Sequence, residues 1–88
     1  MAIHEELREI HWPEEFVVDY ADGTRERLLR GDGVEVIPPE DDPEGCGALW
    51  ARLPKRHPRN QKQCGRYVRF TELRAIHSLG GRLLWPGA

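Results

Sequence analysis

The spacing of apolar residues predicts a helix at the start of the chain. Ile3, Leu7 and Ile10 recur at i, i+4 and i+7 with charged residues between them, which is typical of an amphipathic helix. Pro13 ends the pattern, because the residue before a proline is pushed out of the α region. We therefore expect an N-terminal helix over residues 1–12.

The next segment changes to the two-residue period of β-strands. Phe16, Val18 and Tyr20 alternate with other side chains, and the Asp-Gly pair at residues 22–23 supplies the positive φ of a tight hairpin turn. The partner strand is expected over residues 24–30, with Leu28 in the core. A second Asp-Gly, at 32–33, predicts another turn into a strand at 34–37, and two prolines then end the sheet pairing. The result is a three-strand meander over residues 15–37.

A long loop is predicted from residue 38 to residue 65. Its first part, "PPEDDPEGCGA", is acidic, rich in Pro and Gly and almost without apolar side chains. Leu49, Ala51 and Leu53 share one face of a possible short strand at 49–53. The chain regains a strand pattern at "RYVRF", residues 66–70.

The C-terminal segment permits two interpretations. Thr71 is a good cap for a short helix that would carry Leu73, Ile76 and Leu79 on one face and end at Gly80. Alternatively, "TEL" is one turn before a strand "RAIHSL", with two glycines turning the chain into "RLLW". The second interpretation is favoured, because short strands with a turn signal every eight to twelve residues are typical of a small barrel.

Together these elements predict one mainly β (α+β) domain over residues 1–88. The expected fold is a small antiparallel SH3/Sm-like barrel or roll with an N-terminal helix, a long loop and C-terminal strands over 66–88. A chain of 88 residues has too little apolar surface for two separate cores.

Charge is unevenly distributed along the chain. Residues 1–44 hold 14 Asp or Glu and four Arg, whereas residues 45–88 hold nine Lys or Arg and one acid, so net charges of −10 and +8 give the total of −2. Such asymmetry indicates a surface for a polyanion or a charged protein, unless the two halves fold together and their charges pair.

The basic residues concentrate in "LPKRHPRNQKQCGRYVRF", residues 53–70. Cations interleaved with aromatic rings are typical of single-stranded nucleic-acid binding, where phosphates are neutralised and bases stack. The candidate binding residues are Lys55, Arg56, Arg59, Lys62, Arg66, Arg69, Trp50 and Tyr67. A candidate acidic face, which would imitate a phosphate backbone, consists of Glu5, Glu6, Glu9, Glu14, Glu15 and Asp19.

The sequence gives little support for a metal site or a catalytic thiol. Cys46, His57, Cys64 and His77 are zinc-type ligands, but they are 11, 7 and 13 positions apart rather than in close pairs. Cys64 has cations beside it but no carboxylate to orient a base. We therefore expect no metal, no cofactor, no small-molecule substrate and no catalysis.

The cellular context is read from the apolar runs and the cysteines. No run approaches the roughly 18 apolar residues of a membrane span, and the N-terminus lacks the basic start and apolar core of a signal peptide. The chain is expected to be cytoplasmic and not bound to a membrane. There Cys46 and Cys64 are expected to be reduced thiols, with a disulfide as the minority alternative.

Three stretches, "FVVDYADGTRERLLR", "GVEVI" and "VRFTELRAIHSL", resemble small Sm-like and SH3-like barrels, and among these the Rho-binding antiterminator family. The resemblance implies a transcription regulator that occupies the nucleic-acid-binding surface of a larger machine, or a barrel that binds RNA itself. It brings no catalytic residue. Residues 38–65 depart from that family in being longer and more basic at their end.

The expected function is a non-catalytic module that regulates or inhibits a nucleic-acid-handling protein machine through its charged surfaces. One alternative is direct binding of RNA or single-stranded DNA through residues 55–69. The other, less favoured, is a small thiol- or metal-dependent enzyme.

Overall fold

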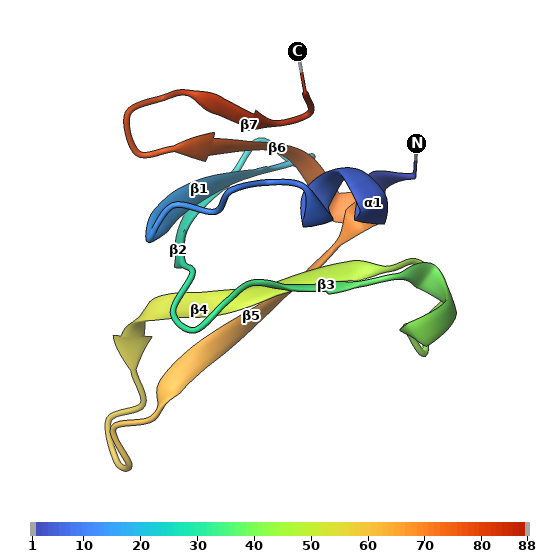
Figure 1. The fold of residues 1–88 in the computed structure, drawn as a ribbon. Coiled ribbons are helices and arrows are strands. Elements are labelled where there is room, and N and C mark those ends of the chain that lie inside the picture. Colours follow the sequence, from blue (N-terminus) through green and yellow to red (C-terminus); the bar gives the residue numbers. More distant parts are fainter. Residues whose placement is uncertain (1, 88) are drawn as a thin grey trace.

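The computed structural model describes residues 2–87 as one short helix beside a curled antiparallel sheet, as Figure 1 shows. The helices and strands are α1 (Ile3–Arg8), β1 (Glu15–Tyr20), β2 (Arg25–Leu29), β3 (Glu35–Ile37), η1 (Pro39–Asp41), β4 (Ala48–Arg56), β5 (Gln63–Arg69), η2 (Phe70–Glu72), β6 (Leu73–Ser78) and β7 (Leu83–Trp85). The sheet curls into a half-barrel, so the predicted mainly β fold with a small antiparallel barrel-like sheet is confirmed.

The first hairpin forms where the alternation predicts it. β1 and β2 pair antiparallel, with Phe16 opposite Leu28 and Val18 opposite Glu26. Gly23 has a φ of 92°, which a side-chain-bearing residue rarely adopts, and its N–H donates to the Tyr20 carbonyl at 3.0 Å. The Asp-Gly signal therefore identified this turn correctly.

The predicted three-strand meander over residues 15–37 is wrong. β3 does not pair with β2; both pair with β4, β2 through Leu29 opposite Arg52 and β3 through Glu35 opposite Trp50. The two strands lie end to end along one edge of β4. The second Asp-Gly therefore makes a turn after which the chain continues along the same edge, and it does not join two paired strands as a hairpin. A turn of this kind and a hairpin turn both use a glycine at positive φ, here Gly33 at 148°. The dipeptide alone does not distinguish them.

The predicted loop over residues 38–65 is also wrong in its second half. β4 is longer than the predicted strand at 49–53, and β5 begins three residues before the predicted strand at 66–70. The register between β4 and β5 shifts between Arg52 and Arg56, and Pro54 lies in that irregular stretch. A proline is tolerated there, because a residue at a bulge need not donate to the ladder.

The C-terminal segment adopts the second of the two predicted conformations. η2 is a single turn after β5, β6 and β7 follow, and the helical interpretation of residues 71–79 is wrong. β6 pairs with β1, Val18 lying opposite Ile76, and β7 pairs with β6.

The N-terminal helix is shorter than the expected 1–12, and Met1 lies outside the described residues. The helix closes with tight bonds, since the Glu9 and Ile10 N–H groups donate to the carbonyls three residues before them. Leu7, a residue of this helix, is fully buried in the core.

The hydrophobic core lies inside the curl of the sheet and under α1. It confirms the predicted inward positions of β1, β2 and β4 and consists of Leu7, Phe16, Val18, Leu28, Leu49, Ala51, Leu53, Val68, Phe70, Leu73 and Ile76. No helix among residues 2–87 is long and apolar enough to cross a bilayer.

Candidate functional site

The predicted basic residues all lie on the hairpin formed by β4 and β5, which extends from the sheet in Figure 1 on the side opposite α1. We call residues 55–62 the hairpin tip and the pair Arg66 and Arg69 the hairpin base. The tip holds Lys55, Arg56, Arg59 and Lys62. These two regions have different partners.

At the hairpin base, Arg66 forms a bidentate contact with Glu26 of β2. Its Nε and Nη2 donate to the two carboxylate oxygens, each at 2.8 Å, and the Tyr20 hydroxyl donates to the same carboxylate at 2.7 Å. Burial by itself raises the pKa of Glu26, but the hydrogen bonds from Arg66 and Tyr20 outweigh it and lower that pKa below its usual value. Arg66 is therefore neutralised by the acidic half of the chain.

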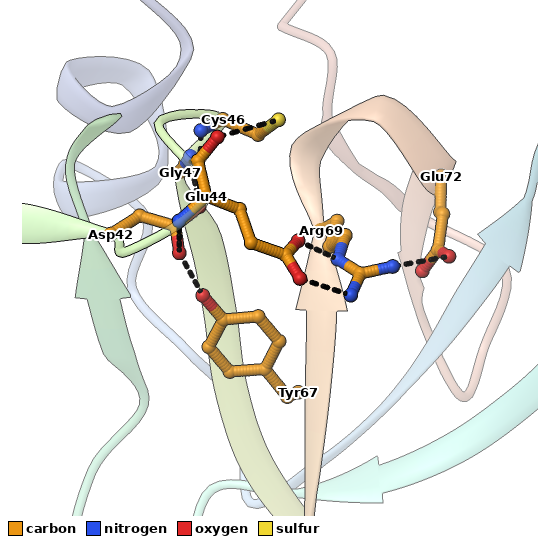
Figure 2. Close-up of polar contacts among 7 residues, drawn as sticks. All are labelled: Asp42, Glu44, Cys46, Gly47, Tyr67, Arg69 and Glu72. Carbon is orange, nitrogen blue, oxygen red and sulfur yellow. Dashed lines mark hydrogen bonds and ion pairs between the residues drawn. The ribbon is translucent and has the colours of Figure 1, made fainter.

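The second base residue is neutralised in the same way. The Arg69 Nη2 donates to Glu44 at 2.7 Å, and its Nη1 lies 3.8 Å from Glu72, as Figure 2 shows. Glu44 comes from the loop between η1 and β4, so a contact across 25 positions of sequence holds that loop against β5. Neither base arginine is available as an unpaired cation.

Asp42 is the residue of this region that sequence analysis missed. Its side chain accepts the backbone N–H groups of Glu44, Cys46 and Gly47 at 2.8 to 3.2 Å, and the Tyr67 hydroxyl at 2.7 Å (Figure 2). The hydrogen bond from Tyr67 lowers the pKa of Asp42, and the same bond raises the pKa of Tyr67 to about 12. An Asp at the start of a Pro/Gly-rich turn is the available signal, because Asp side chains bond their own backbone there.

The hairpin tip has no such partners. Its four cations are exposed, and within residues 2–87 none of them forms an ion pair with a carboxylate. The loop is held by its own backbone, with the His57 N–H donating to the Lys62 carbonyl at 2.7 Å and the Gln61 N–H to the His57 carbonyl at 3.0 Å. Arg56 Nη1 also donates to the Gln61 carbonyl at 2.9 Å. The tip thus presents four positive charges, on the last two residues of β4 and the loop that follows it.

The two aromatic candidates lie away from the tip, on the outer face of the hairpin. Trp50 and Tyr67 are opposite each other in register. The Trp50 ring packs on Gly65, and the Arg52 guanidinium lies 5.1 Å from the ring centroid. Since Tyr67 is tied to Asp42, the expected stacking platform among the tip cations is not formed; the ring present at the tip is that of His57.

The acidic candidates do not form one uniform face. Asp19 is withdrawn from it, because its side chain is only 14% exposed and pairs with Arg25 at 2.8 Å and lies 3.1 Å from His77. Glu6 accepts a long hydrogen bond from the Trp85 indole at 3.5 Å, and Glu15 is half-buried. Glu5, Glu9 and Glu14 remain exposed.

The charge separation predicted between the two halves of the chain is therefore altered by folding. The halves interleave at the hairpin base, and the separation that survives is between the tip, with a net charge of +4, and the remainder of the chain, with −6.

The cysteines and histidines of the described residues do not form a metal-binding cluster. Within the part of the chain that the structure describes, no three His, Cys, Asp or Glu side chains come together to hold a metal ion. Cys46 is exposed and Cys64 half-buried, and both are free thiols.

Comparison with known proteins adds nothing to this geometry, because no protein-family model, curated protein or solved structure matches the chain.

Proposed function

We propose that the chain is a non-catalytic binding module that contacts RNA or single-stranded DNA through the hairpin tip. The observation that carries this proposal is the concentration of four cations without an ion-paired carboxylate at the end of the β4–β5 hairpin. Folding neutralises Arg66 and Arg69 by pairing them with carboxylates, and it leaves the cations of the tip without ion pairs.

The affinity comes from neutralising phosphates. Each contact with a single strand releases counterions, with a salt slope of about −0.7 per phosphate, so three to four contacts predict a slope of roughly −2 to −3. Base stacking contributes little, because His57 is the one aromatic ring at the tip. Binding is expected to be steeply salt-dependent and weakly selective for sequence.

A second candidate is supported by the acidic remainder of the molecule. Its net charge of −6, with Glu5, Glu9 and Glu14 exposed, complements a cationic protein surface such as one that ordinarily holds nucleic acid. In that function the module regulates or inhibits a nucleic-acid-handling machine.

The test is a fluorescence-anisotropy titration of a labelled single-stranded RNA at two salt concentrations, roughly 50 and 200 mM. Lys55→Glu/Arg59→Glu is expected to weaken binding at least about tenfold at low salt and to make the salt slope shallower by about 1.4. The matched control Arg74→Glu/Arg82→Glu makes the same charge change at exposed positions outside the hairpin and is expected to have a smaller effect.

Absence of binding at low salt, or equal losses in the two variants, contradicts contact through the tip. In that case the acidic surface is the remaining candidate. Its test is whether Glu5→Lys/Glu9→Lys abolishes retention on a cationic protein surface.

A further inference from the structure

The half-barrel is open along β5. β5 pairs with β4 through one edge, and no other strand among residues 2–87 pairs with its second edge. The Phe70 N–H donates to the Gly47 carbonyl at 3.1 Å, which sets the alternation of the ladder. The N–H groups of Gly65, Tyr67 and Arg69 and the C=O groups of Gly65 and Tyr67 therefore point away from β4, whereas the Arg69 C=O belongs to the start of η2. An unpaired strand edge of this kind is a template for a further strand.

A groove of about 550 Å³ runs beside this free edge. Two contacts border it: the Arg66–Glu26–Tyr20 hydrogen bonds, and a backbone bond from the Ala21 N–H to the Glu72 carbonyl at 2.8 Å. Residues from β1, the β1–β2 turn, β2, β5 and η2 line it, among them Tyr20, Asp22, Glu26, Arg66, Tyr67 and Glu72. The groove and the edge thus form one continuous surface.

The free charge of the groove is negative. Both of its arginines are occupied, Arg25 by Asp19 and Arg66 by Glu26. Asp22 is an exposed carboxylate, and hydrogen bonds from Thr24 lower its pKa and keep it ionised. Glu72 is also exposed, with its carboxylate 3.8 Å from the Arg69 Nη1.

The groove also offers aromatic rings to a bound cation. Tyr20 and Tyr67 both line it, and Tyr67 is 40% exposed. A Lys or Arg side chain is attracted both to carboxylates and to the face of an aromatic ring. The chemistry that complements this groove is therefore a cationic side chain on an extended backbone.

We propose that an extended basic segment of a partner protein adds as a strand to the free edge of β5 and places a Lys or Arg side chain in the groove. Charge favours this occupant over the alternatives. A second copy would bring a body with a net charge of −2, and a nucleic acid would bring phosphates toward Asp22 and Glu72. The groove shares no lining residue with the hairpin tip, so the two surfaces are distinct.

The probe is a labelled peptide of about nine residues in which lysine alternates with threonine, since threonine favours strands. A peptide with glutamate in place of lysine is the charge control. Asp22→Lys/Glu72→Lys is expected to weaken binding of the lysine peptide at least about tenfold. Glu35→Lys/Glu40→Lys makes the same charge change at exposed positions outside the groove and is expected to stay within about threefold of the parent.

Amide hydrogen exchange followed by NMR locates the contact. Adding the lysine peptide is expected to slow exchange about tenfold at the Gly65, Tyr67 and Arg69 amides, which gain acceptors across the new ladder. The tip variant Lys55→Glu/Arg59→Glu is expected to retain this protection.

Four results overturn the proposal. The lysine peptide fails to bind, or the groove variant and its control lose equal affinity. Protection of the three amides that grows with protein concentration alone identifies a second copy at the edge. Protection of the same amides by an oligonucleotide identifies a nucleic acid there.

Discussion

The tip and the base of the β4–β5 hairpin come from one run of basic residues, yet they end in different electrostatic environments. Arg66 and Arg69 lie where β5 passes Glu26 of β2 and the loop after η1, and each meets a carboxylate. The tip lies at the far end of the hairpin, and in the described structure none of its cations forms an ion pair with a carboxylate. Charge in the sequence therefore becomes surface charge only where the fold supplies no partner.

The base also differs from the tip in what its polar groups do for the fold. The Glu26 side chain is 23% exposed and joins β2 to both β1 and β5 through Tyr20 and Arg66. Asp42 is 6% exposed and organises the turn that leads into β4. We infer that base residues maintain the half-barrel and that tip residues are free for a ligand.

The largest effect on stability is expected from removing the carboxylate that pairs with Arg66 of the hairpin base. Glu26→Ala leaves Arg66 and Tyr20 without their shared acceptor, and the free energy of unfolding is expected to fall by roughly 1 to 2 kcal/mol, a value limited by solvent at this partly exposed site. Urea denaturation measures it. The control Glu35→Ala removes an exposed carboxylate of β3 and is expected to change stability by less than about 0.5 kcal/mol. Equal effects would show that the base contact is no stronger than an ordinary surface charge.

A smaller effect is expected in the dependence of stability on pH. The pKa values of Glu26 and Asp42 lie below the ordinary values of these carboxyl groups, 4.5 and 3.8, so the unfolded chain takes up protons first as the pH falls. The stabilisation is complete above those ordinary values and is lost as the pH falls through the lower folded pKa values.

Urea midpoints measured from roughly pH 6 to pH 3 test this dependence. Asp42→Asn removes one of the carboxylates with a lowered pKa and is expected to flatten the curve, whereas Asp41→Asn, at an exposed neighbour, is expected to leave its slope unchanged. An unchanged slope in the Asp42 variant would contradict the assignment.

The smallest effect is expected on RNA affinity when the paired arginines of the hairpin base, and not the cations of the tip, are replaced. Arg66→Gln/Arg69→Gln removes two positive charges from the same basic segment, but these charges are already paired with carboxylates. Affinity for single-stranded RNA is expected to stay within about threefold of the parent, against the loss of about tenfold or more in the tip variant. A loss as large as that of the tip would show that the whole segment, base included, binds the nucleic acid.

Local patterns identified the strands and misjudged how some of them pair. The alternation of Phe16 and Val18, and of Leu49 and Leu53, identified inward faces because a strand with one buried face must repeat every two residues. The meander failed because the Asp-Gly at residues 32–33 specifies a backbone conformation and not the strand that comes next to it. The loop prediction failed because Pro54 indicates irregular backbone, while the bulge that accommodates it depends on the partner strand.

The candidate site was predicted in composition and not in arrangement. The basic segment was correctly located, but Trp50, Tyr67, Arg66 and Arg69 were grouped with the tip although their partners lie elsewhere. Their partners, among them Glu26, Asp42 and Glu44, are up to 40 positions away in sequence. Spacing along the chain carries no information about such contacts.

The sequence by itself determined a mainly β chain with one short helix, its inward-facing residues and the concentration of cations between β4 and β5, because burial period and charge are properties of neighbouring residues. Tertiary structure decided which cations stay unpaired, which edge of β5 stays open and how β3 is placed. These depend on the strand register, which brings together groups far apart in sequence and sets whether an arginine meets a carboxylate or solvent.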